Sequence, residues 1–305
     1  MNYEKRSPIV VIGSINTDMI VSSDSLPRPG ETVLGREFLM TGGGKGANQA
    51  VAAARLGGQV TMVGNLGRDL FGDAAKASLI GETVDCHHVN QDSARASGVA
   101  LISVDKQGEN QIVVAPGANS TLSVQHLDAA LASLPLHAVV LLQLEIPLAT
   151  VTHAVNLAAD KRCRVILDPA PAQTLSDDLL SKLYLITPNQ IEAEALTGVE
   201  VRDVDSAIQA AGLLLERGPQ HVALTMGAAG VLLASQGNHE MIPAHTVQPV
   251  DTTAAGDCFN GAVAFALSVG EELSEAVRFA CRAAATSVTR QGAQSSMPRA
   301  NEINS

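Results

Sequence analysis

Aromatic residues are scarce in this chain of 305 residues: they make up 2% of it, and tryptophan is absent. A surface that stacks nucleic-acid bases needs such side chains, so their scarcity argues against one. Positive charge is also limited, because 20 Lys and Arg stand against 31 Asp and Glu and leave a net charge of −11. We therefore expect neither nucleic acid nor an anionic membrane as a partner, and an anionic substrate would need a local positive site such as a helix N-terminus.

Cysteines and long apolar runs are equally few. The four cysteines are scattered and form no C-x-x-C pair: Cys86, Cys163, Cys258 and Cys281. They offer no zinc ligand set, and a chain with 46% hydrophobic residues has enough core material to fold without disulfides. The apolar run at residues 258–270 is shorter than the ~18 residues of a membrane span, and the run at 9–12 is too short for a secretion signal. We expect a soluble protein of a reducing compartment, the cytoplasm.

Short apolar runs recur along the chain and predict buried strands. They are Ile9–Gly13, Val60–Val63, Val139–Leu144, Val165–Leu167, Tyr184–Ile186 and Val222–Thr225. Continuous rather than alternating apolarity is typical of parallel strands that are covered on both faces. Helical segments lie between them, for example at 47–56, 123–133, 147–160 and 205–216. This alternation predicts an α/β fold with a doubly wound, mostly parallel sheet and helices on both faces.

Two segments break this alternation. Residues 97–105 and 109–115 flank Lys106-Gln107-Gly108, which is a hairpin signal, and residues 19–40 are too rich in Pro and Gly for a long helix. We expect a small antiparallel β lid formed by residues 16–42 and 96–117. Residues 1–15, 43–95 and 118–305 then form the α/β domain.

A glycine-rich segment, residues 41–49, precedes a predicted helix. Adjacent glycines let a ligand approach the backbone closely. The pattern Gly42-x-Gly44-x-x-Ala47 formally matches a dinucleotide fingerprint, which keeps a nicotinamide-dependent dehydrogenase as an alternative, but no strand directly precedes it. A Walker A loop is excluded because Gly46 follows Lys45 at the position where that motif has Ser or Thr. The alternative is a tight turn before a helix; the polar pair Lys45 and Asn48 favours a ligand loop.

Polar side chains follow several of the predicted strands. Asn16 and Asp18 come after the first strand, and Glu145 ends the run that starts at Val139. Ligands bind at the carboxyl edge of such sheets, although Asn16 and Asp18 could also form an Asx turn. Asn189 and Glu192 fit either a helix capping box or a polar cluster near phosphates and Mg²⁺.

The segment Val250–Asp257 places small residues just before an apolar helix. The backbone N–H groups at such a helix start, together with the helix dipole, form an anion hole. Asp257 could simply complement the dipole. A carboxylate beside an anion hole is also how a general base is placed against an alcohol, and we favour this function.

Five ordered motifs resemble one known family. They are residues 13–18, residues 43–50, Asn189-x-x-Glu192, Asp251-Thr252-x-Ala254-Ala255-Gly256-Asp257, and residues 288–296. In order and spacing, over nearly the whole chain, they are similar to the signatures of the ribokinase-like (PfkB) carbohydrate kinases. Thr41-Gly42 and Thr253 are mild departures from the family pattern.

The resemblance implies a kinase that uses ATP with Mg²⁺ to phosphorylate the 5-hydroxyl of D-ribose, and a homodimer whose lids clasp each other. It implies Asp257 as the base and Ala254, Ala255 and Gly256 as the anion hole. The sugar would be held by Asn16, Asp18, Gly43, Gly44, Lys45, Asn48 and Glu145. ATP would contact Asn189, Thr225, Gly227, Gly230, Gly256 and Cys281, with Glu192 acting indirectly on Mg²⁺.

The resemblance also implies an activating K⁺ site. Its ligands, several through backbone carbonyls, would come from Asp251, Thr253, Ser287, Arg290, Gly292 and Ser296. Asp251 could instead cap its own loop through the hydroxyls of Thr252 or Thr253.

Three alternative functions stay open. A kinase of the same family could act on deoxyribose, fructose or a nucleoside. A sugar-binding regulator without catalysis would not need the intact Asp257 segment. A dehydrogenase would explain neither this segment nor the cation loop.

Overall fold

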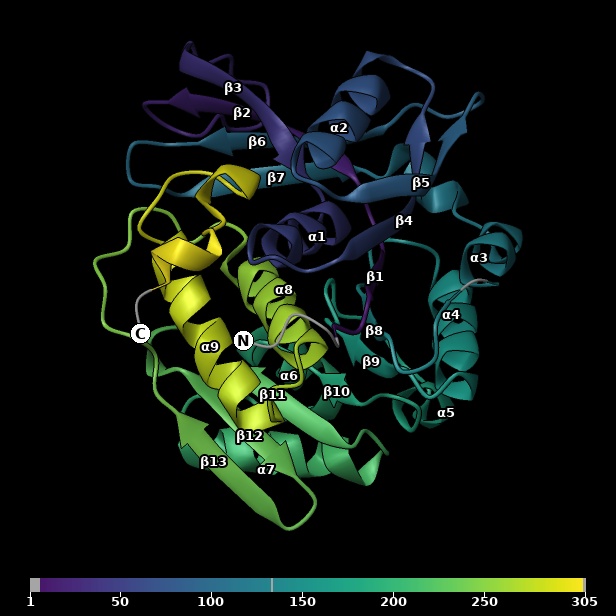
Figure 1. The fold of residues 1–305 in the computed structure, drawn as a ribbon. Coiled ribbons are helices and arrows are strands. Elements are labelled where there is room, and N and C mark those ends of the chain that lie inside the picture. Colours follow the sequence, from purple (N-terminus) through teal and green to yellow (C-terminus); the bar gives the residue numbers. More distant parts are fainter. Residues whose placement is uncertain (1–5, 133, 304–305) are drawn as a thin grey trace.

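A large, mostly parallel sheet forms the centre of the molecule (Figure 1). The computed structural model describes residues 6–132 and 134–303. Within these ranges the sheet has nine strands, in the spatial order β13 (Asn238–Ile242), β12 (Val231–Ser235), β11 (His221–Thr225), β10 (Leu185–Ile186), β9 (Arg164–Leu167), β8 (Val139–Leu142), β1 (Ile9–Ile12), β4 (Val60–Gly67) and β5 (Asp85–Asp92). Neighbours pair in parallel, except that β12 runs antiparallel to β11 and β13. The predicted α/β fold class is confirmed.

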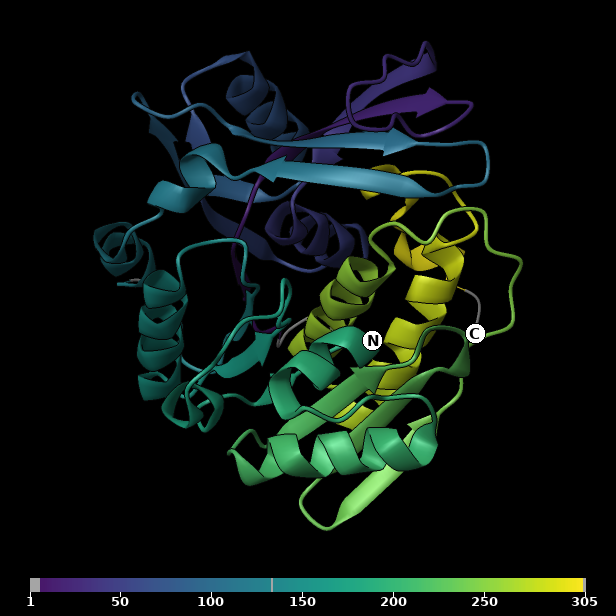
Figure 2. The same cartoon turned by 180° about the vertical axis from the view of Figure 1, so that it is seen from behind.

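Helices cover both faces of this sheet, as the views from the front and from behind show (Figures 1 and 2). The helices are α1 (Lys45–Arg55), α2 (Leu70–Gly81), α3 (Val124–Leu131), α4 (Leu148–Asp160), α5 (Asp177–Leu180), α6 (Gln190–Thr197), α7 (Val204–Glu216), α8 (Ala255–Ser268) and α9 (Leu273–Ser287). Short 3₁₀ turns lie at Gly117–Thr121, Gly227–Ala229, Gln294–Ser296 and Ala300–Glu302.

Strand β1 is apolar at every position because a hydrophobic core lies on each of its two faces. Ile9 and Val11 pack into a core with α1, α8 and α9, whereas Val10 and Ile12 pack into a second core with α3, α4 and α7. Successive side chains of a strand point to opposite faces, so a strand with a core on each side needs apolar residues at every position. All six predicted strands are present for this reason.

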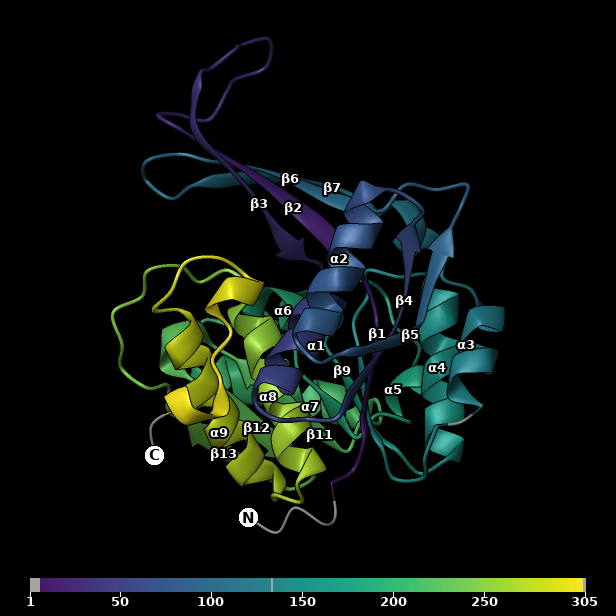
Figure 3. The ribbon, with the colours of Figure 1, turned by 45° about the horizontal axis from the view of Figure 1, so that its top comes forward.

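A second sheet of four strands lies above the large sheet (Figure 3). Its order is β3 (Gly35–Gly43), β2 (Asn16–Ser23), β6 (Gly98–Val104) and β7 (Asn110–Ala115). The pairs β2–β3 and β6–β7 are antiparallel hairpins, and β2 and β6 join them in parallel. This parallel pairing, which the expected antiparallel lid did not include, arises because β2 follows β1 and β6 follows β5, and both leave the same edge of a parallel sheet.

One predicted helix differs slightly in its range from the observed helix. The predicted helix at 123–133 begins after Ser123, whose hydroxyl accepts a hydrogen bond from the His126 N–H, and it is observed as Val124–Leu131. Ser133, residues 1–5 and residues 304–305 lie outside the described residues. Of the helices in the described ranges, none is long and apolar enough to cross a membrane. All four cysteines are free thiols.

Candidate active site

The start of α1 is packed directly against the connection that follows β1. Gly44 has a φ of +85°, and a Cβ atom there would lie 2.7 Å from the backbone nitrogen of Asn16. The Ala47 N–H donates to the Ser14 carbonyl over 2.9 Å. Only glycine permits both this backbone conformation and this approach. The glycine-rich segment is therefore a tight turn before a helix, and the same turn brings the polar residues of α1 to the carboxyl edge of the sheet.

A cluster of polar side chains gathers at this edge, between the large sheet and the lid. Glu145 accepts hydrogen bonds from the Ser14 hydroxyl over 2.5 Å and from the Lys45 N–H over 3.1 Å. Asp18 is buried beside Gly43, where a Cβ atom would lie 2.2 Å from the Asp18 carboxyl carbon. Burial, together with the charges of Glu145 and Asp257, raises the pKa of Asp18 to about 6. The segments chosen as sugar contacts thus meet in one place.

Two further residues complete this cluster. Asn16 is buried, and its Oδ1 accepts a hydrogen bond from Asn119 over 2.7 Å. Asn48 is buried as well, and its Oδ1 has no hydrogen-bond partner among the described residues. An unpartnered buried carbonyl is costly unless a ligand satisfies it. Asn48 therefore offers an acceptor to a hydroxyl-bearing ligand.

Lys45 is the positive charge of the cluster. Burial lowers the pKa of its ammonium group, but the carboxylates of Asp257, Asp168, Glu145 and Glu192 outweigh burial, so the net shift is upward. Lys45 therefore stays charged in a site whose other charges are negative.

Asp257 lies in the first turn of α8, whose preceding residue Ala254 has a φ of +57° and caps the helix without a side-chain hydrogen bond. Its Oδ2 accepts a hydrogen bond from Asn48 Nδ2 over 2.9 Å. The first N–H groups of a helix have no partner within the helix, and the helix dipole adds positive potential there. One carboxylate thus stands beside a set of backbone donors, next to the polar cluster.

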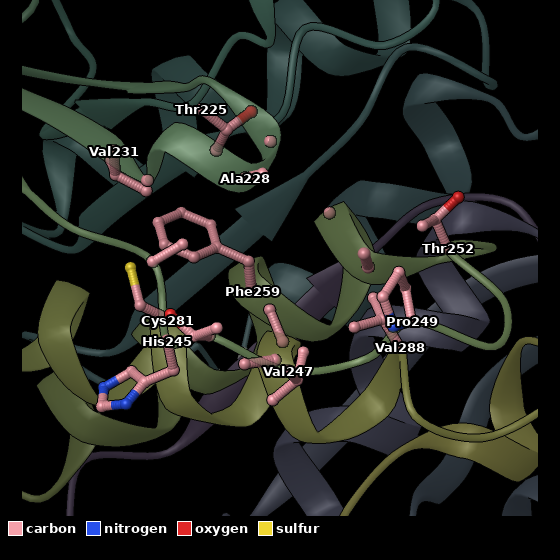
Figure 4. A pocket seen from close by; sticks show the side chains of 18 residues that line it. Thr225, Ala228, Val231, His245, Val247, Pro249, Thr252, Phe259, Cys281 and Val288 are labelled. Carbon is pink, nitrogen blue, oxygen red and sulfur yellow. The ribbon is translucent and has the colours of Figure 1, made fainter.

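A cavity of about 420 Å³ lies on the other side of this helix start (Figure 4). Its lining includes Thr225, Gly227, Gly230, Gly256 and Cys281, all chosen from the sequence as nucleotide contacts. Val231, Phe259 and Val288 give the cavity apolar walls, which suit a flat heteroaromatic base.

Other lining residues were not predicted from the sequence. The residues 244–247 and 249 of one loop and the α9 residues Ala284 and Ala285 also line the cavity. They carry no charge pattern or motif, and Phe259 belongs to an apolar run that resembles any buried helix. Asn189, predicted as a nucleotide contact, does not line this cavity.

Asn189 and Glu192 form the capping box that was the structural interpretation of this pair. The Glu192 N–H donates to Asn189 Oδ1, and the Asn189 N–H donates to Glu192 Oε2, each over 2.8 Å. Burial and the charge of Asp257 raise the pKa of Glu192, against the opposing effect of Lys45. Among the described residues, no group of three or more His, Cys, Asp or Glu could hold a metal ion by itself. A Mg²⁺ ion here would therefore depend on phosphate oxygens and water, as Mg²⁺ commonly does.

The predicted cation loop is joined to the segment before α8. Asp251 accepts hydrogen bonds from the N–H groups of Thr253, over 2.9 Å, and of Gly292, over 2.8 Å. Burial alone would raise the pKa of Asp251, but these hydrogen bonds outweigh it and lower the pKa. Asp251 thus caps its own loop, chiefly through backbone donors, and also ties that loop to residues 288–296.

The other predicted cation ligands lie around this junction. Ser287 and Ser296 are buried, and their hydroxyls donate to the carbonyls of Ala284 and Ala293. The Arg290 guanidinium pairs with Glu302 over 2.7 Å, so the carbonyl is the group of Arg290 that suits a cation. A carbonyl- and hydroxyl-rich junction with one carboxylate matches the oxygen donors that a K⁺ ion needs.

Sequence reasoning missed one acidic residue of the site. Asp168 directly follows β9, is 4% exposed, and accepts a hydrogen bond from Gln49 Nε2 over 2.8 Å. The signal that selected Glu145, a carboxylate at the end of a buried strand, applies equally to Asp168.

The carboxylate of Asp257 lies between a cluster of polar side chains and a cavity suited to a nucleotide, beside the backbone donors at the start of α8. This fold and site define an ATP-using phosphotransferase that acts on a small polyhydroxy substrate. The model of the pfkB family of carbohydrate kinases matches residues 6–300. The chain belongs to this family.

Known relatives are similar to this chain, in sequence or in structure, over nearly its full length. A ribokinase of Haemophilus influenzae is 46% identical over 297 residues, 97% of either chain. A deoxyribokinase of Salmonella typhi is 37% identical over 297 residues, again 97% of either chain. The structure of Arabidopsis thaliana ribokinase complexed with ribose and ATP superposes with a TM-score of 0.89 at 31% identity, covering 98% of this chain and 97% of that one.

Proposed function

We propose that the protein phosphorylates D-ribose at the 5-hydroxyl with ATP and releases ribose 5-phosphate and ADP. The observation that carries the proposal is the position of Asp257, in the first turn of α8 with the polar cluster on one side and the nucleotide cavity on the other. The ribokinase of Haemophilus influenzae and the ribose- and ATP-bound Arabidopsis structure support the choice of substrates.

In the proposed reaction, Asp257 takes the proton of the sugar hydroxyl while that oxygen attacks the γ-phosphoryl group. General-base catalysis of this kind contributes on the order of 10²–10⁴-fold to the rate. The backbone N–H groups of Ala254, Ala255 and Gly256 receive the negative charge of the transferring group in this proposal. The Ala255 N–H donates to the Thr252 carbonyl over 3.2 Å, so it exchanges this partner for the phosphoryl group. Lys45 adds a fixed positive charge.

The sugar is neutral and rich in hydroxyls, and the cluster has matching groups. Asn16, Asp18 and Glu145 offer amide and carboxylate oxygens, and the unpartnered Oδ1 of Asn48 gains a donor when a hydroxyl binds. Gly43 and Gly44 let the ligand approach the backbone. The lid, residues 16–42 and 96–117, closes over the sugar in this proposal and keeps water from competing as the acceptor.

Two ions assist in this proposal. Glu192 and Asn189 would act through water on a Mg²⁺ ion that accompanies ATP, and this ion would neutralise phosphate charge. Asp251, Thr253 and the carbonyls of residues 287–296 would hold K⁺, which would keep the anion-hole loop in shape. The hydrogen bond from the Gly292 N–H to Asp251 supports this second site because it already joins the two segments.

We also propose that two copies associate through their lids. The register of the lid sheet places Met40, Met19, Leu101 and Val113 in one row, on the face opposite Asp18. Leu101 is 54% exposed and Val113 is 66% exposed. A partner lid would cover this apolar face.

The free cysteines are in keeping with a cytoplasmic enzyme.

A screen for ADP release distinguishes the possible substrates. With Mg²⁺ and K⁺ present, we expect D-ribose to give the highest kcat/KM, ahead of 2-deoxy-D-ribose, D-fructose and adenosine. A higher value for 2-deoxy-D-ribose would replace ribose with deoxyribose, the substrate named for the Salmonella relative. Calorimetric sugar binding without any ADP release would instead favour a regulator, and reduction of NAD⁺ with ribose would favour a dehydrogenase.

A further inference from the structure

A buried chain of hydrogen bonds lies behind Asp257. The side chain of Gln49 is completely buried, and its Nε2 donates to Asp257 Oδ1 over 3.0 Å and to Asp168 Oδ2 over 2.8 Å. Its Oε1 accepts a hydrogen bond from Gln143 Nε2 over 2.6 Å. One amide therefore links α1 to the start of α8 and to the ends of β8 and β9.

This arrangement fixes the orientation of the Asp257 carboxylate. Asn48 donates to Oδ2 and Gln49 donates to Oδ1, so two consecutive residues of α1 hold the two oxygens. The orientation of the Gln49 amide is set by its partners, because a reversed carbonyl would face the Asp257 carboxylate and lose the donor from Gln143. Each oxygen of Asp257 keeps a further lone pair for a hydroxyl.

Charged side chains from several elements surround Asp257. Lys45, Asp168, Asp18 and Glu192 all interact electrostatically with Asp257. Burial, aided by the charge of Asp257, raises the pKa of Asp168 to about 8, so Asp168 is largely neutral at pH 7. Without the shared amide, the Asp257 carboxylate would keep only its hydrogen bond from Asn48 and could rotate about it.

We propose that Gln49 is a positioning residue for phosphoryl transfer, holding the Asp257 carboxylate in the orientation that receives the proton of the sugar hydroxyl. The proposal rests on the proposed function of Asp257 as general base. Gln49 belongs neither to the predicted sugar contacts nor to the lining of the nucleotide cavity. Its effect should therefore fall on the chemical step rather than on binding.

The test uses two variants of the full-length protein. Gln49→Met keeps the length of the side chain and removes the donor, and Gln49→Glu keeps its shape but places a third carboxyl group beside those of Asp257 and Asp168. We expect kcat with D-ribose to fall about 10- to 100-fold in both variants, while the KM values for ribose and ATP change less than about threefold. The pH–kcat profile should also shift in both variants, because the group that takes the proton has lost a hydrogen-bond donor.

Asn65→Leu is the matched control. Asn65 is a buried amide on β4 that donates to Thr121 over 3.1 Å, and no hydrogen bond among the described residues joins it to Asp257. It should lower the melting temperature comparably and leave the pH profile unchanged. The same profile shift in Asn65→Leu would show a general effect of destabilisation and overturn the proposal.

Thermal unfolding and calorimetric ribose binding show which variants are folded, and if Gln49→Met does not fold, the isosteric Gln49→Glu decides. Normal kcat and an unshifted pH profile in a folded variant would overturn the proposal, as would a loss that appears entirely in ribose affinity. Asp257→Asn separates the two claims. If Asp257→Asn is active, the proposed function itself fails; if it is inactive while Gln49→Met is normal, only the role of Gln49 fails.

Discussion

Asp168 is a carboxyl group of the site whose ionised form is costly to bury. Its carboxyl group is buried at the end of β9, where it accepts a hydrogen bond from Gln49. Burial raises its pKa from 3.8 to about 8 despite the charge of Lys45. Because the folded state prefers the neutral acid, its contribution to stability is fully present below about pH 3.8 and is lost as the pH rises through about 8.

Replacing this acid with a neutral isostere should therefore stabilise the protein most at high pH. Asp168→Asn keeps an oxygen that can accept from Gln49 and removes the titration. Its melting temperature should exceed that of the wild type by an amount that grows roughly 2–3 °C per pH unit between pH 5 and 7.5. Thermal unfolding of the ligand-free protein at constant ionic strength measures this difference.

Asp178→Asn is the control for this prediction, because the Asp178 side chain is 71% exposed. Its difference from the wild type should stay nearly constant over the same pH range. A constant difference for Asp168→Asn as well would mean that Asp168 does not titrate as described.

Some site residues could be predicted from the sequence because they lie in a recognisable local motif. Asp257 stands in a run of small residues before an apolar helix, and Asn48 follows a glycine-rich turn, so both could be chosen without coordinates. The pairing of Gln49 with Asp168 could not, because it joins residues 119 positions apart and depends on how α1 packs against α8 and the large sheet. Asn189 and Glu192 had two interpretations, and the capping box is present in the structure.

At the scale of elements, the start of α8 depends on its neighbours for its shape. The loop before it contains little side-chain packing, and its backbone is tied at Asp251 to the segment after α9. Arg55 of α1 fixes that segment in turn, through hydrogen bonds to the carbonyls of Gln294, over 2.7 Å, and Met297, over 2.8 Å. The loop that we propose receives the phosphoryl group is thus held by α1, α9 and the C-terminal segment together.

The proposed K⁺ site predicts a selective effect of monovalent cations. Exchanging K⁺ for tetramethylammonium at constant ionic strength should lower kcat several-fold and leave the calorimetric affinity for ribose nearly unchanged, because the cation shapes the anion hole and does not touch the sugar. Na⁺ should restore activity poorly. Asp251→Ala should be slow in all three salts, and equal activity of the wild type in all three would contradict the site.

Elements were predictable where burial dictates composition. The central strands are apolar because a core lies on each side of them, but β5 is polar at most positions, since it is the edge strand next to β4. Its sequence therefore does not stand out as a strand. The hairpin of β12 and β13 was also missed, because its turn at Ser235–Asn238 and its half-buried second strand resemble an exposed loop.

At the scale of the whole molecule, the lid exposes apolar side chains on both faces, since the row of Leu39, Ile20, Ile102 and Ile112 lies on the same face as Asp18. Asp18 lies on the face toward the polar cluster, and the row that contains Met40, Leu101 and Val113 lies on the other. An apolar face of this kind on a four-stranded sheet is typical of an interaction surface. The parallel pairing of β2 with β6 joins the two hairpins into one surface, so both inserted segments contribute to it.

The proposed lid dimer predicts that one charge on this face separates the copies. Leu101→Glu should convert the dimer to a monomer at micromolar concentration, measured by light scattering on a sizing column. Leu70→Glu introduces the same charge at a side chain that is 85% exposed on α2, outside the lid, and should remain dimeric. A monomeric wild type, or a dimeric Leu101→Glu variant, would contradict association through the lids.

The central claim is that Asp257 activates the primary hydroxyl of ribose for phosphoryl transfer from ATP. Phosphorus NMR of a reaction with D-ribose, ATP, Mg²⁺ and K⁺ follows the product and its position directly. The account predicts a single new phosphomonoester, coupled to the protons of carbon 5 and equal in amount to the ADP formed. The initial rate should fall about 10²–10⁴-fold in Asp257→Asn, with ribose affinity retained. Phosphate on another position, no phosphorylated ribose, or a near-normal rate in Asp257→Asn would contradict the account.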